Sequence, residues 1–229
     1  MGVRGLEKFN KVLRLGIKFM KQLDGRNTKT PYEEFLGMCL SGNNRILSSI
    51  KLLYMFNFPE DGTTLSRNLL ELLIDLEYIR LDKTRAGEFI DFTHFKMASI
   101  YPNSEPFEYG SQFKNKVRWS QVPFEKMLED VGSENPEVAK VFKELYKNLC
   151  MFSHPSALGL SMRLGLCKGD YGRHKKMRKD LKKILGDCSP ILALMILDRI
   201  NKEFNLGNER DIERIFECLP YEHTKLRMC

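Results

Sequence analysis

Residues 63–82, TTLSRNLLELLIDLEYIRLD, have the pattern of a helix that is buried on most of its sides. Leucines stand at 65, 69, 70, 72, 73 and 76, and such a broad apolar surface is typical of a helix inside a bundle. The two threonines at its start are expected to cap it. Arg67, Glu71 and Asp75 follow at intervals of four, which places them on one face. Because charges in a core must be paired or serve chemistry, this stripe is the first candidate site.

Composition sets the class of protein. The chain has 229 residues, of which 42% are hydrophobic, enough for one domain with its own core. The net charge of +7 and a pI near 9.0 favour an anionic partner such as nucleic acid or an acidic membrane surface. Six cysteines occur without a C-x-x-C pair or a histidine at ligand spacing, which suits a reducing cytosol. We therefore expect a cytoplasmic protein without a cofactor.

Hydrophobic periodicity predicts helices throughout the chain, and no stretch alternates convincingly as a strand would. The predicted fold class is all-α, a multi-helix bundle forming a single domain over 1–229. Within it, a basic helix and linker would occupy 1–30, the core bundle 31–205, and a last helix and tail 206–229. Helices are expected near 3–23, 31–57, 63–82, 85–100, 136–153, 191–205 and 208–219.

Three helix starts are signalled by a capping residue followed by proline, and one of them is Asn135 before Pro136. Thr30 precedes Pro31, and Glu33 completes a capping box. Ser189 precedes Pro190 in the same way, which predicts that a new helix begins there.

A long loop and the single tryptophan follow the helix predicted at 85–100. Residues 101–117 contain two prolines and little periodicity, so a long loop is expected, of the kind that often forms a lid or a binding segment. The single tryptophan, Trp119, follows this loop and is expected to pack in the core or at its rim.

The N-terminal helix over 3–23 is amphipathic and carries lysines and arginines along one side. Such a helix can lie on a membrane surface or along a phosphate backbone. A core helix with a solvated lysine face is the favoured interpretation, so peripheral membrane contact is disfavoured. No segment approaches the roughly 20 apolar residues of a transmembrane helix.

A second basic stretch, RHKKMRKDLKK, covers 173–183 and contains one acidic residue. It is the best candidate in the chain for contacts with RNA phosphates. A solvated helix face is an equally good interpretation, because the stretch has no aromatic residues between its cations to stack on bases. The RNA-binding residues that we predict from it are Arg173, Lys175, Lys176, Arg178 and Lys179.

One of the four histidines, His154, lies in a Ser-His-Pro-Ser corner at the end of a predicted helix. Its pKa range suits a general acid or base, and Arg67 could hold a phosphate. In the structural alternative, Arg67 and Glu71 form an intrahelical pair, extended to His154, that orients two helices. A metal site made of Glu71, Asp75 and His154 would lack a donor, so no metal is predicted.

At these residues the sequence resembles the prokaryotic family called domain of unknown function 5677. The resemblance rests on the R-x-x-x-E helix from Arg67 to Glu71 and on the Ser-His-Pro-Ser corner at 153–156. It covers roughly 35–200. The family is largely uncharacterised, so the resemblance implies a helical fold and leaves the activity open.

A looser similarity connects the chain to the HEPN superfamily, whose active members are metal-independent ribonucleases of toxin and antiviral systems. Those enzymes use an arginine and a histidine, R-x(4–6)-H, on the scissile phosphate and the 2′-hydroxyl. The comparable segment runs from Lys147 to His154, with lysine in place of arginine. Lysine lacks the planar fork of arginine, so either activity is lost or Arg67 supplies the guanidinium. The similarity also implies a homodimer.

Two main functional hypotheses follow. In the first, the chain is a HEPN-like metal-independent RNA-cleaving protein of a bacterial defence or toxin system. His154 is then the acid or base, Arg67 and Lys147 bind phosphate, and Glu71 orients Arg67 or His154. In the alternative, the chain is a non-catalytic helical module that binds protein or nucleic acid, and the same residues form a structural polar network.

Overall fold

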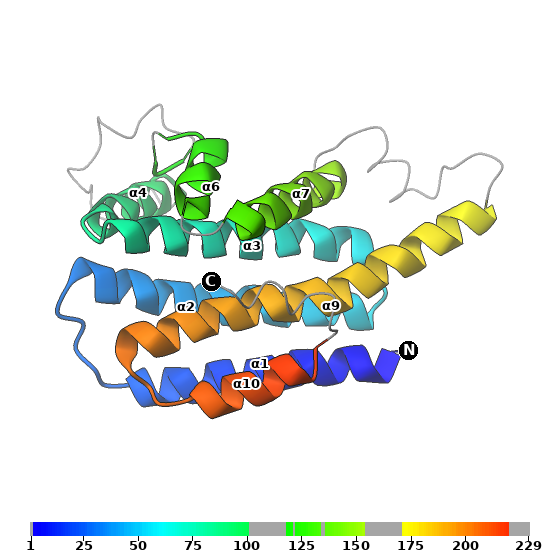
Figure 1. Cartoon of the computed structure of the whole chain (residues 1–229), viewed down its shortest axis with the longest axis horizontal. Coiled ribbons are helices and arrows are strands. Elements are labelled where there is room, and N and C mark those ends of the chain that lie inside the picture. The colour runs from blue at the N-terminus through cyan, green and yellow to red at the C-terminus, as the bar shows by residue number, and fades with distance from the viewer. Residues whose placement is uncertain (1, 101–117, 121, 134–135, 154–170, 220–229) are drawn as a thin grey trace.

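The structure is a computed structural model and describes residues 2–100, 118–120, 122–133, 136–153 and 171–219. The described residues form eight α-helices and no strand, so the predicted all-α class is confirmed (Figure 1). No helix among them is long and apolar enough to cross a membrane. The helices are α1 (Gly2–Leu23), α2 (Pro31–Met55), α3 (Pro59–Leu81), α4 (Arg85–Ile100), α6 (Phe124–Gly132), α7 (Pro136–Ser153), α9 (Tyr171–Phe204) and α10 (Glu209–Glu217).

The centre of the bundle is α3, as its leucine-rich sequence predicts. It packs on α2 and α9 and on α6 and α7, while α1 and α10 lie beyond α2 and α9 (Figure 1). Leu69, Leu73 and Leu76 are fully buried. The helix begins earlier than predicted, however, at Pro59. The hydroxyl of Thr63 donates to the carbonyl of Glu60 inside the first turns, so the predicted threonine cap is wrong.

The predicted start of α2 is confirmed. The hydroxyl of Thr30 accepts a hydrogen bond from the backbone N–H of Glu33 over 3.2 Å, and Pro31 is the first helical residue. The helix then continues past Asn43 and Asn44, whose side chains are both buried. Asn44 packs so closely on Gly16 of α1 that a Cβ at Gly16 would overlap its amide. Glycine there allows α1 and α2 to approach.

The predicted helix start at Ser189 is wrong, because α9 runs without a break through Pro190. Ser189 does not cap a helix; its Oγ lies 2.7 Å from the Oγ of Ser66 in α3. A proline inside a helix costs about 3 kcal/mol. Leu185 and Ile191, on either side of it, are fully buried, and each such burial contributes about 1.5–3 kcal/mol. Packing on α2 and α3 therefore keeps the two halves in one helix.

Candidate functional site

A polar network joins α3 to α7. Nε and Nη2 of Arg67 lie 3.0 and 2.9 Å from the same carboxylate oxygen of Glu71, so the predicted intrahelical pair is present. The hydroxyl of Tyr146, from α7, is 3.3 Å from that oxygen and 3.3 Å from Arg67 Nη2. The spacing of four along α3 places the two charged groups on the face that α7 covers. We call these three residues the Arg67 network.

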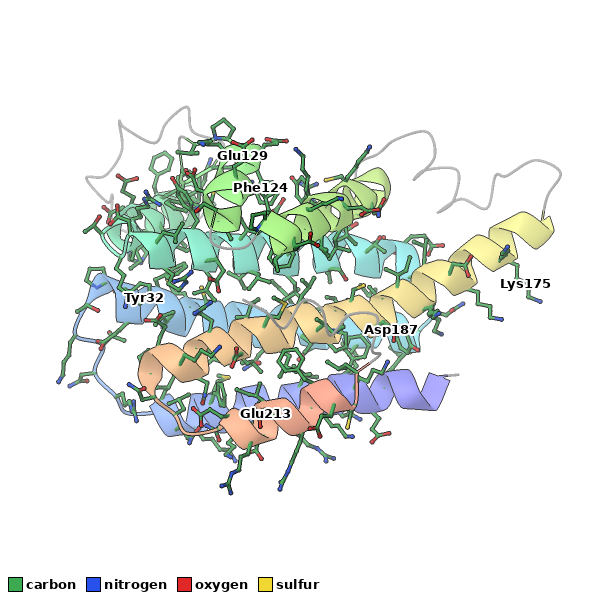
Figure 2. The ribbon with its side chains drawn as sticks, viewed as in Figure 1. Tyr32, Phe124, Glu129, Lys175, Asp187 and Glu213 are labelled. Atoms are coloured by element: carbon green, nitrogen blue, oxygen red, sulfur yellow. The ribbon has the colours of Figure 1, made fainter. Side chains whose placement is uncertain are left out.

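Aromatic packing holds the network in place. The ring of Phe124, from α6, lies against the ring of Tyr146 with a centroid separation of 4.2 Å, and Figure 2 shows Phe124 on the short helix beside α7. The guanidinium of Arg67 is 5.3 Å from the Tyr146 ring centroid, within cation–π range. The side chains of Arg67 and Glu71 keep 21% and 23% of their exposure. Both side chains are therefore partly accessible to solvent.

The protonation states in the network follow from these contacts. Burial, with a further contribution from the charge of Glu71, raises the pKa of Tyr146 to about 12. The phenol therefore stays protonated at neutral pH and can donate a hydrogen bond. Burial lowers the pKa of Arg67, but the charge of Glu71, its hydrogen bond and smaller contributions from Tyr146 and Cys150 together outweigh the burial, so the pKa is raised overall. The network thus presents a permanent cation and a neutral hydroxyl.

Asp75, the third member of the predicted stripe, belongs to a different set of contacts. Its Oδ1 accepts a hydrogen bond from Trp119 Nε1 over 3.1 Å and lies 3.6 Å from Arg118 Nη2. Burial raises its pKa to about 6, against the lowering effects of Arg118 and Trp119. The packing role predicted for Trp119 is confirmed, since its ring is buried and contacts Tyr78 and Phe89.

The remaining predicted catalytic residues lie on or beyond α7. Lys147 is exposed and follows Tyr146 directly, so it lies beside the Arg67 network in sequence. The helix ends at Ser153, and His154 lies outside the described residues. In the part of the chain that the structure describes, no three histidine, cysteine, aspartate or glutamate side chains are grouped as metal ligands.

The basic stretch of 173–183 forms the N-terminal part of α9. This end of α9 extends beyond the rest of the bundle, and Figure 2 shows Lys175 on it. Lys175, Lys176 and Lys179 are exposed, whereas the side chain of Arg173 lies outside the described residues. Arg178 turns toward the bundle, where its Nε is 2.9 Å from Glu60 Oε1.

Sequence reasoning missed a second polar cluster on α3. Glu77 accepts two hydrogen bonds from Arg199 of α9, over 2.7 and 3.0 Å, and one from Arg80 over 2.8 Å. The i, i+3 spacing of Glu77 and Arg80 was a local signal for part of it. The partner in α9 is 122 positions away, and no local pattern could have identified it.

A model of the family described as "family of unknown function (DUF5677)" matches residues 33–172. This range is more than half of the chain, and it contains both the R-x-x-x-E helix and the Ser-His-Pro-Ser corner. The chain therefore belongs to this family. The match ends earlier than the sequence resemblance suggested and leaves out most of α9. Neither the curated proteins nor the solved structures gave a significant match.

Proposed function

We propose that this DUF5677 protein cleaves RNA without a metal ion, as part of a bacterial defence or toxin system, at a site between α3 and α7. One observation carries the proposal: Tyr146 of α7 contacts both Arg67 and Glu71 of α3. Tyr146 precedes Ser153, the last residue of α7 and the first of the Ser-His-Pro-Ser motif, by seven positions, so the contact joins the R-x-x-x-E helix to the helix that comes before this motif.

The proposed reaction is attack of the RNA 2′-hydroxyl on the adjacent phosphorus. The new P–O2′ bond forms as the P–O5′ bond breaks, leaving a 2′,3′-cyclic phosphate and a free 5′-hydroxyl. His154 is proposed to take the proton from the 2′-hydroxyl while water protonates the leaving 5′-oxygen, or, in the opposite role, to protonate that oxygen while water takes the proton of the 2′-hydroxyl. Arg67 and Lys147 stabilise the negative charge that develops on the phosphate. Glu71 holds the guanidinium in position, and Tyr146 offers a further donor.

A specific observation favours the second candidate function, a non-catalytic helical module. The charge of Arg67 is already engaged by Glu71 and by the hydroxyl of Tyr146. In this second function, the Arg67 network has a structural role alone and fixes α3 against α7. In that case the exposed lysines of α9 would bind nucleic acid or an acidic protein, and no bond would be broken.

An RNA-cleavage assay in EDTA separates the two functions. Wild type is compared with His154→Ala and Arg67→Ala, after circular dichroism has shown that each variant is folded. Arg26→Ala is the matched control, because Arg26 is exposed in the linker after α1. Cleavage by wild type and the control alone supports the proposal. If wild type cleaves none of several RNAs, the binding module is the better description.

The proposal includes a homodimer, since the HEPN-like enzymes pair two sites. Light scattering during gel filtration gives the mass directly, for comparison with 26.7 kDa for one chain. A monomer that still cleaves RNA would separate the activity from dimerisation.

A further inference from the structure

A group of large apolar side chains is exposed where α2 ends and α3 begins. Leu52, Met55, Phe56 and Phe58 keep between 50% and 69% of their exposure, and Phe56 is the most exposed of them. Single exposed apolar residues are ordinary. Four within seven positions form an apolar patch, and such patches often mark interaction sites. We call these residues, with Asn57 between the two phenylalanines, the aromatic turn.

Hydrogen bonds join the aromatic turn to the basic end of α9. Asn57 has a left-handed backbone, with φ of 62°, which asparagine tolerates better than most residues. Its carbonyl accepts a hydrogen bond from Arg178 over 2.7 Å, and its side-chain oxygen accepts one from Lys182 over 3.1 Å. The backbone that carries Phe56 and Phe58 is therefore held beside a cationic helix.

The charge beside the aromatic turn is strongly positive. Lys175, Lys176 and Lys179 are exposed on α9, and Asp180 is the only acidic residue in 175–183. Two carboxylates stand at the start of α3: that of Glu60 is paired with Arg178, and Asp61 is exposed. This surface therefore complements a polyanion. The sequence of α9 lacks aromatic residues among its cations, and the fold supplies them from about 120 positions earlier in the chain.

We propose that the aromatic turn and the basic end of α9 together bind single-stranded RNA. Bases stack on Phe56 and Phe58, while Lys175, Lys176 and Lys179 contact the phosphates. Exposed aromatic rings beside a row of cations are the combination that single strands require, because every base has a face that can stack. Paired RNA keeps its bases inside the helix, so it gains no stacking here. This inference rests on the proposed RNA function and narrows its substrate to unpaired strands.

The aromatic turn directly precedes α3, the helix that carries Arg67 and Glu71. Nine residues separate Phe58 from Arg67, which corresponds to about 14 Å along α3. Glu60, the partner of Arg178, precedes Arg67 by seven residues and so lies on the same side of α3. A strand held by the turn and by α9 would therefore lie within a few nucleotides of the network.

The test measures binding to a fluorescein-labelled oligouridine by anisotropy, using the full chain. The RNA carries 2′-O-methyl groups, which remove the attacking hydroxyl, so binding is read separately from cleavage. Phe56→Leu and Phe58→Leu keep the apolar volume but lose the flat ring, and each is expected to weaken binding about tenfold. Phe56→Tyr keeps the ring and is expected to bind as wild type does.

The charge contribution has its own matched control. Neutralising Lys175, Lys176 and Lys179 together to glutamine is expected to weaken binding and to reduce its dependence on salt. The triple variant Lys21→Gln, Arg26→Gln and Lys29→Gln makes the same change in net charge near the opposite end of the bundle and is expected to bind normally.

Three results would overturn the inference. The leucine variants could bind oligouridine as tightly as wild type does, or wild type could fail to bind it at all. Wild type could also bind vesicles of anionic phospholipid in place of RNA, with this binding kept by the leucine variants and lost in Phe56→Ser. If His154→Ala cleaves no RNA but still binds oligouridine, the result supports the proposed reaction and leaves the inference about binding unchanged.

Discussion

Trp119 Nε1 donates a hydrogen bond to Asp75 Oδ1 across 3.1 Å, inside the core of the bundle. The two residues are 44 positions apart, and the bond joins the segment before α6 to the middle of α3. Arg118, 3.6 Å from the same oxygen, provides the nearby positive charge. A buried carboxyl held in this way makes the stability of the protein depend on pH.

Replacing Asp75 by asparagine tests this dependence. Burial raises the pKa of Asp75 from 3.8 to about 6, so between these values the folded protein holds a proton that the unfolded chain has released. The raised pKa of Asp75 adds to the free energy of unfolding below pH 4, where the carboxyl is protonated in both states. This contribution is lost as the pH rises through 6, and the loss is about 3 kcal/mol at most. We expect Asp75→Asn to be more stable than wild type at pH 8, with a gap that closes toward pH 4.

Urea unfolding at several pH values measures that gap. Asp24→Asn, at an exposed position of the linker, is the control and should follow wild type throughout. An Asp75→Asn curve parallel to that of wild type would contradict the assignment of the pH dependence to this carboxyl.

The Arg67–Glu71 pair is expected to stabilise the fold modestly. Both side chains retain about a fifth of their exposure, so solvent screens the pair only in part. A double-mutant cycle with Arg67→Ala and Glu71→Ala should give a coupling of about 1 kcal/mol. The exposed i, i+4 pair of Asp198 and Lys202 is the reference, expected at about 0.3–0.5 kcal/mol. Equal couplings for the two pairs would show that the Arg67 network adds nothing by its burial.

Alanine at Gly62 is expected to destabilise the protein by about 1–3 kcal/mol. A Cβ there would collide with the end of the Leu185 side chain in α9, which is fully buried, so its neighbours in the core would have to repack. At Gly37 in α2, no atom lies within 4 Å of the new Cβ. Gly37→Ala should therefore stabilise by about 0.5–1 kcal/mol through the helix preference of alanine. Thermal unfolding of both variants gives the comparison, and shifts of the same sign would refute it.

Glutamine in place of Glu77 should cost about 3 kcal/mol. The change removes the charge that Arg80 and Arg199 share, and both arginine side chains are mostly buried. Asp211→Asn breaks the exposed pair between Asp211 and Lys18 and should cost less than about 1 kcal/mol. Chemical denaturation gives both values. If Glu77→Gln lowered the free energy of unfolding by less than Asp211→Asn does, Arg80 and Arg199 would have found other partners.

The parts of the fold that sequence could predict are those set by neighbouring residues. The cap at Thr30 was predictable because its donor and acceptor are three residues apart. The Arg67–Glu71 pair was predictable from its spacing of four. The breadth of the apolar surface of α3 also identified the central helix correctly.

The failures concern interactions between distant segments. Pro190 is a strong local stop signal, but burial of its neighbours against α3 overrides it. Asp75 shares a helical face with Glu71, but its carboxylate contacts Trp119 and Arg118 and takes no part in the Arg67 network. The short helix α6 was missed because its nine residues have no side-chain cap at the start.

The position of α1 has a consequence for synthesis on the ribosome. Its buried Phe9, Val12 and Phe19 face a bundle whose later helices, α9 and α10, include contacts with α1. Lys8 is paired with Asp187, 179 positions further along the chain. At about 5–20 residues translated per second, synthesis of the chain from Lys8 to Asp187 takes roughly 10–35 s. During this time only α2 and the chaperones of the cell can cover its apolar face, so final docking of the first helix is among the last events of folding.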